Sequence, residues 1–286
     1  MGMRSASVSD LQGVSEMKIS FSCIDCVSDP LEWLFKVEEA GFDGLEVIAE
    51  GSQSLGSEDE ESEFKEKLRE IHETTSLEIS LHAPLSDINI ASVNEGIWRE
   101  SVRQVKQSIA LAHDFVSEIC VVHPGSLSPL SVQMPEDAVL ERQKAALREI
   151  CKFASDFGLC VAVENMTPEE MLLCRKPEEL VRLVEEVDAE NIGICLDIGH
   201  AFATGTLQEF LKLIGGEGER SGARVVHVHV SDNFGRNDEH LALGRGGVNW
   251  SDVLAALKNF AGIVVTEMQS FEDGVESLKF LRKFLR

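Results

Sequence analysis

Short hydrophobic segments rich in β-branched residues alternate along the chain with longer segments whose apolar positions recur every three or four residues. The short segments predict eight strands, at 17–23, 43–49, 77–82, 118–123, 159–165, 192–197, 224–230 and 262–267. The longer segments predict amphipathic helices, at 31–40, 63–74, 95–115, 135–157, 176–187, 207–214, 250–259 and 274–284. Strands that alternate with helices form parallel sheets, so this order indicates repeated βα units. Eight such units in about 270 residues predict a single (β/α)8 TIM barrel.

The same pattern predicts one domain. Inside 17–286, no stretch rich in proline, glycine and serine is long enough to be an interdomain linker. Residues 1–16 are rich in serine and lack an apolar core, so we expect a disordered N-terminal extension rather than a signal peptide. The sequence contains no run of about 18 consecutive apolar residues, which argues against a membrane span.

Composition and charge narrow the class of partners. The chain has 286 residues, with 26 Lys and Arg against 50 Asp and Glu, and a formal net charge of −24. Such a chain should repel nucleic acid and anionic membranes unless a local basic patch intervenes. The seven cysteines are odd in number and several lie in apolar runs, which favours a reducing cytoplasm. Cys23 and Cys26 have metal-site spacing, but without a second pair a metal or redox role is the less favoured interpretation.

Candidate ligands occur where a barrel places its active site, at the C-terminal ends of the strands. Each strand from the third to the eighth ends in a histidine or a carboxylate, and further candidates follow strands six and seven. The candidate metal ligands are His82, His123, Glu164, Asp197, His200, His229, Asp238, His240 and Glu267. A lone residue of this kind is ordinarily a structural histidine or a helix cap, but together the nine indicate a shared site. Converging carboxylates repel one another unless cations lie between them, and mixed imidazole and carboxylate ligands suit zinc, manganese or iron.

The remaining histidines are interpreted by their positions. His227 and His229 lie two residues apart on one strand, so both face the barrel interior. Only His229 reaches the mouth, and we expect His227 to fill the layer beneath it. His72 and His113 fall in helical segments and are interpreted as surface or packing residues.

Two stretches resemble the superfamily of xylose isomerase-like barrels, which includes endonuclease IV and the sugar phosphate isomerases and epimerases. They are residues 193–205 (GICLDIGHAFATG) and 238–246 (DEHLALGRG), and the resemblance spans about 17–286. Endonuclease IV holds three zinc ions through nine side chains, and each has a counterpart in this sequence. The resemblance implies three ligand groups: His82, His123 and Glu164; a bridging Glu164 with Asp197, His229 and Glu267; and His200, Asp238 and His240.

The resemblance leaves two mechanisms open. In single-metal epimerases only the second group is kept, and this implies that Glu164 and Glu267 also act as a catalytic acid/base pair. A metal there would acidify a C–H beside a sugar carbonyl, and the glutamates would move the proton. The full set of nine favours phosphodiester hydrolysis by three ions instead. The implied cofactor is therefore one to three divalent ions per chain, zinc or manganese.

Other features argue against a DNA substrate. An abasic-site nuclease grips many phosphates, yet the predicted loop after strand two is acidic at 58–63. An equally acceptable interpretation is that 58–63 opens the next helix, where carboxylates favour the helix dipole. Where endonuclease IV commonly has an aromatic residue after the first histidine ligand, this sequence has Ala83 and Pro84, and tyrosine is absent.

Arg245 is a candidate substrate-binding residue. It lies in the segment 244–247 (GRGG), whose backbone N–H groups and guanidinium could bind a phosphate. Relatives often carry an acidic residue there, so the arginine suggests an anionic small substrate. A surface arginine in a turn is the competing interpretation.

The favoured hypothesis is a cytoplasmic, metal-dependent sugar or sugar-phosphate isomerase/epimerase with a small-molecule sugar as its partner. The alternative is an endonuclease IV-like, zinc-dependent abasic-site endonuclease acting on DNA. A dehydration on the same metal scaffold is a third possibility.

Overall fold

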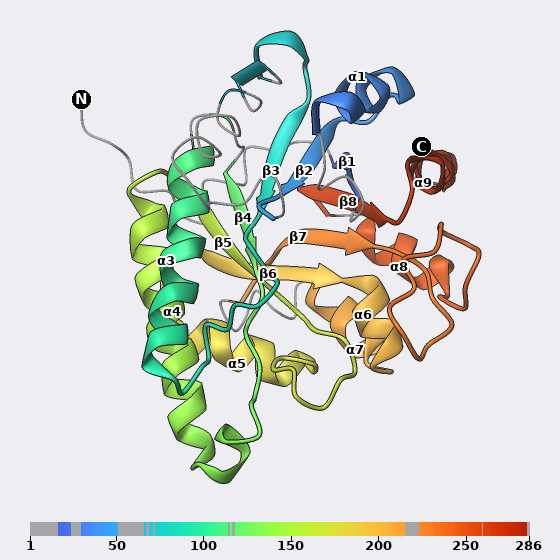
Figure 1. Cartoon of the computed structure of the whole chain (residues 1–286). Coiled ribbons are helices and arrows are strands. Elements are labelled where there is room, and N and C mark those ends of the chain that lie inside the picture. The colour runs from blue at the N-terminus through green and yellow to red at the C-terminus, as the bar shows by residue number, and fades with distance from the viewer. Residues whose placement is uncertain are drawn as a thin grey trace.

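Eight parallel strands close into a barrel in sequence order, with β1 also pairing with β8 (Figure 1). The computed structural model describes residues 17–23, 30–50, 66, 69–70, 72–113, 115, 118–214, 223–258 and 260–284. The strands are β1 (Lys18–Cys23), β2 (Gly44–Ile48), β3 (Glu78–His82), β4 (Ile119–Val122), β5 (Cys160–Glu164), β6 (Ile192–Asp197), β7 (Val225–Val230) and β8 (Ile263–Met268). Each lies within one residue of its predicted bounds, which confirms the predicted single (β/α)8 barrel.

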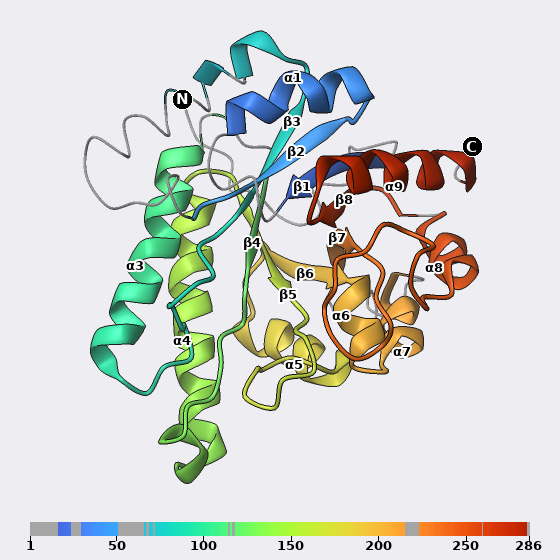
Figure 2. The same cartoon turned by 45° about the vertical axis from the view of Figure 1, so that its right-hand side comes forward.

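Helices surround the strands on the outside of the barrel (Figures 1 and 2). They are α1 (Pro30–Ala40), α3 (Glu95–Ala112), the 3-10 helix η4 (Ser131–Gln133), α4 (Glu136–Ser155), α5 (Pro177–Val187), α6 (Ile198–Ala203), α7 (Leu207–Lys212), α8 (Trp250–Leu257) and α9 (Phe271–Phe284). Within the predicted helix 63–74, the described residues 66, 69–70 and 72–74 are helical.

Three helix predictions need correction. The prediction missed α6 because a helix of six residues is too short to show an apolar period. The helix predicted to begin at Gly274 begins at Phe271 instead, since the Ser270 hydroxyl accepts the Asp273 N–H and caps the first turn. The helix predicted over 95–115 ends at Ala112.

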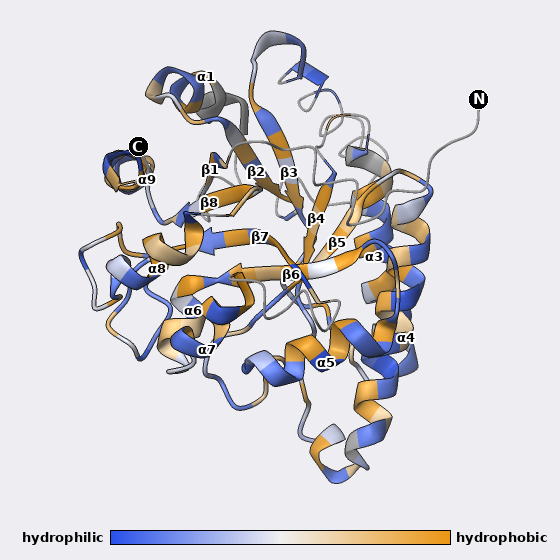
Figure 3. Cartoon of the chain, turned by 180° about the vertical axis from the view of Figure 1, so that it is seen from behind, coloured by the Kyte–Doolittle hydropathy of each residue, from blue (hydrophilic) through white to orange (hydrophobic). Residues whose placement is uncertain are grey.

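Side chains of each strand alternate between the outside and the inside of the barrel, and this separates an outer core from an inner one. Outward-facing side chains such as Leu45 and Val47 pack against the helices in one continuous hydrophobic cluster. The ribbon coloured by hydropathy shows mainly apolar strands inside helices of mixed character (Figure 3). Inside the barrel, Val121 and Ala162 belong to a second, smaller apolar cluster. His123 lies two residues beyond Val121, and so this alternation points it inward at the mouth.

Some predictions fall outside the described residues. These are the extension over 1–16, the pairing of Cys23 with Cys26, and the acidic segment 58–63, all of which stay predictions. Among the helices that the structure describes, none is long and apolar enough to cross a membrane.

Candidate metal centre

The barrel brings all nine predicted ligands to one end, although they come from six strands and the segments after them. Seven of the nine side chains are buried, and His123 and Asp238 are half-buried. The ligand atoms converge in three clusters that match the groups implied by the resemblance. Their coordination of metal stays a prediction.

Glu164, the last residue of β5, joins the first two clusters. Its Oε2 lies 3.0 Å from His123 Nε2 and 3.4 Å from His82 Nε2, while its Oε1 lies 2.9 Å from His229 Nδ1. The two carboxylate oxygens therefore face different groups of histidines. This is the arrangement that a bridging ligand between two ions requires.

The second cluster contains three carboxylates around one imidazole. Ligand atoms of Glu164, Asp197, His229 and Glu267 all lie within 4.8 Å of one another. His229 Nδ1 is 3.3 Å from Glu267 Oε2 and 4.0 Å from Asp197 Oδ2. Asp197 and His229 are register partners on adjacent strands, so the sheet itself sets their spacing.

The third cluster joins α6 to the long loop between β7 and α8. Asp238 Oδ2 lies 3.1 Å from His200 Nε2 and 2.6 Å from His240 Nε2. This loop also contacts α6 through Asn233, whose amide donates to the Gly199 carbonyl. Figures 1 and 2 show the loop beside α6 in both views.

Two carboxyls of the centre have pKa values shifted in opposite directions. Burial by itself raises the pKa of Glu164, but the charge of His229 and hydrogen bonds from His123 and His229 outweigh it and hold the pKa well below its usual range. For Asp197, burial raises the pKa to about 7; the charge of His200 opposes this shift, and that of Glu164 adds to it. Neighbouring carboxyls with separated pKa values are typical of acid/base sites.

The residues fit a divalent metal ion. Asp197 Oδ2 and Asp238 Oδ1 are buried and have no hydrogen-bond partner among the described residues. An unpaired buried carboxylate oxygen is unfavourable, and a bound cation would satisfy both atoms. Imidazole nitrogens mixed with carboxylate oxygens are ligands that zinc and manganese accept.

Asn165 orients two of the candidate ligands, and the sequence analysis did not identify it. Its Oδ1 accepts the Asp197 N–H at 2.8 Å, and its backbone carbonyl lies 2.8 Å from His200 Nδ1. Asp197 in turn caps α6 by accepting the His200 N–H at 2.6 Å. The available signal was a polar residue directly after a buried strand, beside the candidate Glu164.

Glu46 was also missed, and it lies one layer beneath the mouth. It occupies the middle of β2, and its carboxylate lies between His227 and His229. The signal was a single acid in an otherwise apolar strand, on the inward face by strand alternation. The expectation that His227 fills the layer below His229 is confirmed, because His227 is fully buried against Glu46.

Residues outside the centre have structural contacts. His113 packs its ring against Phe157 with centroids 4.4 Å apart, which confirms its interpretation as a packing residue. The Arg245 guanidinium pairs with two acids of α9, at 2.7 Å from Asp273 and in contact with Glu276. Half of the Arg245 side chain is exposed, and its contact with a substrate stays a prediction.

A closed parallel barrel with histidines and carboxylates gathered at its carboxyl end defines a class of (β/α)8 proteins with a metal-type site. Within that class, the xylose isomerase-like TIM barrel family matches residues 34–284. The chain belongs to this family.

The proteins that this chain resembles include an epimerase-like protein and a probable endonuclease. An uncharacterised protein of Methanocaldococcus jannaschii is 33% identical over 275 residues, which cover 95% of this chain and 90% of that protein. A solved structure described as a D-tagatose 3-epimerase-like protein superposes with a TM-score of 0.83 at 32% identity, covering 94% of this chain and 97% of that one. A probable endonuclease 4 of Mycobacterium leprae is 27% identical over 227 residues, covering 75% of this chain and 81% of that protein.

Proposed function

We propose that the protein is a metal-dependent isomerase or epimerase of sugars or sugar phosphates. The observation that carries the proposal is the cluster of Glu164, Asp197, His229 and Glu267 at the barrel mouth, because it combines a metal-type ligand set with two glutamates able to move protons. The epimerase-like relative supports it, since it covers more of this chain at higher identity than the endonuclease relative does.

The two glutamates provide the proton chemistry. A divalent ion held by the four residues would polarise a sugar carbonyl and the adjacent hydroxyl, making the neighbouring C–H more acidic. One of Glu164 and Glu267 accepts the carbon-bound proton, and the other carboxyl returns a proton to the other face or the neighbouring carbon. Burial opposes ionisation of Glu267, but the charge and hydrogen bond of His229 outweigh it and lower its pKa. Because the pKa of Glu164 is lowered too, both residues begin as carboxylates and either can act as the base, while the other takes up a proton from solvent before it donates one to the substrate carbon.

The proposal is tested by incubating the metal-loaded protein with ketoses and ketose phosphates in deuterated water. We expect solvent deuterium at one sugar carbon, and a loss of exchange of about 100-fold or more in Glu164→Gln or Glu267→Gln, the range typical of general acid/base groups. Glu170→Gln, at an exposed position, is the matched control and should exchange normally. Metal content is measured for each variant. Exchange that persists in both site variants at unchanged metal content would refute the assignment.

The complete third cluster favours a second candidate, an endonuclease IV-like abasic-site nuclease. His200, Asp238 and His240 are brought together as a three-ion mechanism would need. This candidate predicts about three zinc ions per chain and cleavage of an abasic-site duplex that His200→Ala abolishes. One bound ion with deuterium exchange and no cleavage would exclude it.

We also propose that the protein works in the cytoplasm. Five cysteines, at positions 120, 151, 160, 174 and 195, are free and buried, as expected in a reducing compartment. Fractionation of the source cells, with the protein detected by antibody, tests this.

A further inference from the structure

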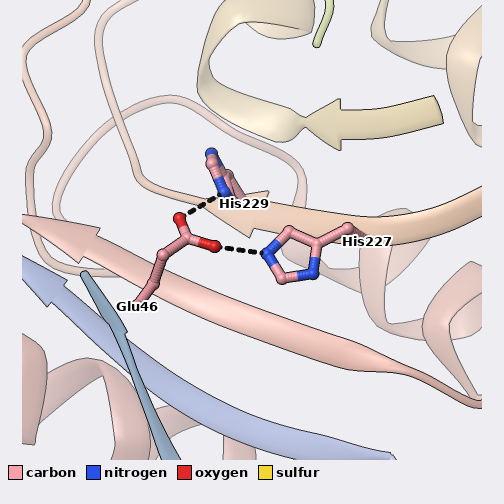
Figure 4. A group of neighbouring side chains, drawn as sticks. All are labelled: Glu46, His227 and His229. Carbon is pink, nitrogen blue, oxygen red and sulfur yellow. Dashed lines mark hydrogen bonds and ion pairs between the residues drawn. The ribbon is translucent and has the colours of Figure 1, made fainter. Parts of the chain in front are cut away.

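A buried carboxylate lies under the metal centre and contacts one of its candidate ligands from below. Glu46 projects from β2 into the barrel, and Figure 4 shows its two oxygens pointing at two different histidines of β7. Oε1 lies 2.9 Å from His229 Nε2, and Oε2 lies 2.8 Å from His227 Nε2. The Ser80 hydroxyl donates to Oε2 at 2.9 Å. Glu46 is therefore held on one oxygen and directed at His229 with the other.

The two nitrogens of His229 face different surroundings. Nδ1 faces the mouth, where it lies 2.9 Å from Glu164 Oε1, and Nε2 faces Glu46. A neutral imidazole carries only one N–H, so Glu164 and Glu46 compete to accept it. A proton on Nδ1 would block that nitrogen as a metal ligand, whereas a proton on Nε2 leaves the Nδ1 lone pair directed at the mouth.

A bound ion would select the second arrangement. Nδ1 is hydrogen-bonded to Glu164 Oε1 at 2.9 Å, whereas Nε2 and Glu46 Oε1 form an ion pair at 2.9 Å and neither of these two atoms has a hydrogen-bond partner among the described residues. An ion at Nδ1 would need the lone pair of that nitrogen and would leave the one N–H of the neutral ring on Nε2. Glu46 Oε1, a carboxylate oxygen that accepts but does not donate, lies within reach of that N–H.

We propose that Glu46 is a positioning residue of the metal centre, which accepts the His229 Nε2–H and keeps Nδ1 free to bind the ion. Metal-binding histidines commonly donate their second N–H to a carboxylate, which sets the ring orientation and makes the imidazole a stronger ligand. The inference rests on the metal site of the proposed function but is independent of the reaction catalysed there.

A purely structural role accounts poorly for this carboxylate. Glu46 is 3% exposed, and among the described residues its hydrogen-bond and ion-pair partners are Ser80, His227 and His229, none of them a lysine or arginine. Burial of a charged group is unfavourable, and an apolar side chain of similar size would fill the same space more stably. The contact with His229 gives the charge a function.

The test is a Zn²⁺ titration of the full chain against a competing chelator. We expect Glu46→Gln, which keeps the shape but removes the charge, to weaken Zn²⁺ binding by about 10- to 100-fold. Asn191→Ala is the matched control, because it removes two buried hydrogen bonds, to the Cys151 and Leu159 carbonyls, at the start of β6 and far from the mouth. It should lower stability and leave Zn²⁺ affinity unchanged. Wild-type affinity in Glu46→Gln would overturn the proposal.

A second measurement is made on the wild-type chain, and a variant serves only to assign one signal. In the Zn²⁺-loaded, ¹⁵N-histidine-labelled chain, two-bond ¹H–¹⁵N spectra report which nitrogen of each ring carries the proton. The His229 signal, identified by its absence in His229→Gln, should show protonation at Nε2 and a metal-bound Nδ1. The opposite pattern would refute the proposal.

The outcomes separate this inference from the proposed function. Weaker Zn²⁺ binding in Glu46→Gln, together with no deuterium exchange in any sugar, would support the role of Glu46 and contradict the isomerase proposal. Deuterium exchange in a sugar, together with unchanged Zn²⁺ affinity in Glu46→Gln, would support the isomerase proposal and contradict the role of Glu46.

Discussion

Histidines and carboxyls of the candidate metal centre determine one another's protonation. Burial alone lowers the pKa of His240, but a hydrogen bond to Asp238 and the charge of Glu267 outweigh it and raise the pKa to about 9. Asp197 keeps its proton to about pH 7 for the opposite reason, since burial and neighbouring carboxylates disfavour its charge. Near neutral pH the centre therefore holds protons on groups that a metal ion would need deprotonated.

This predicts that the affinity for Zn²⁺ rises with pH. Protons bound to the free chain must leave when the ion binds, so affinity increases as pH rises and levels off once the groups are already deprotonated. We expect the affinity to go on rising above about pH 7 at the second cluster and above about pH 9 at the third, because the pKa values of His229 and His200 are raised as well as those of Asp197 and His240. Calorimetry in buffers of different ionisation enthalpy measures the protons released. His240→Gln should reduce the number of protons released at high pH, and affinity independent of pH would contradict the prediction.

At the scale of elements, one carboxylate organises the loop between β7 and α8. Asp232 Oδ1 accepts the N–H groups of Asn233 at 2.9 Å and Val248 at 3.1 Å. Its Oδ2 accepts the Gly244 N–H at 2.9 Å and the Trp250 indole N–H at 2.8 Å. Both ends of the loop thus meet at one buried side chain. The segment between them carries Asp238 and His240, two thirds of the third ligand cluster.

We therefore expect Asp232→Asn to loosen this loop. The amide replaces one acceptor oxygen by a donor, so two of the four N–H groups lose their partner, at about 1–3 kcal/mol for each group left unpaired. Thermal unfolding should show the loss of stability, and metal analysis should show the third cluster weakened more than the second. Asp137→Asn, at an exposed position, is the control. Unchanged stability and metal content in Asp232→Asn would contradict this account of the loop.

At the scale of the whole molecule, charge decides which polymers can approach. The formal net charge of −24 opposes binding of a polyanion, because affinity for DNA comes largely from cations that replace its counterions. Some of the carboxylates that contribute to this charge, such as Glu164, Asp197 and Glu267, lie at the mouth itself. Small neutral or singly phosphorylated sugars meet much less repulsion than a duplex does.

The net charge of the chain predicts negligible binding of DNA. A fluorescent duplex with an abasic site should show no saturable change in anisotropy with the Zn²⁺-loaded chain at about 0.15 M salt, and little even at lower salt, where electrostatic attraction would be strongest. A known abasic-site endonuclease serves as the positive control. Tight binding whose affinity falls steeply with salt would show a basic surface that the net charge conceals, and would favour the nuclease candidate.

Much of the fold and of the candidate site was predictable from local sequence. Short apolar segments rich in β-branched residues, alternating with longer segments of period three to four, predicted every strand within one residue. Because parallel strands present their carboxyl ends at one mouth, residues such as His82 and Glu267 could be assigned to a common site although they lie far apart in the chain. The local pattern determined both the strands and the residues at their ends, because the place where a strand ends is a property of a short segment.

The tertiary structure decided which groups face each other inside the barrel. Glu46 and His227 are separated by 181 positions in the sequence, and only barrel closure places them in contact. In the same way, the ion pair of Arg245 with Asp273 depends on where α9 packs against the loop. Contacts of this kind arise from the register and curvature of the whole sheet, which no single segment encodes. The sequence by itself therefore determined the barrel and the histidines and carboxylates at its mouth, and only the closed fold determined what lies beneath and beside them.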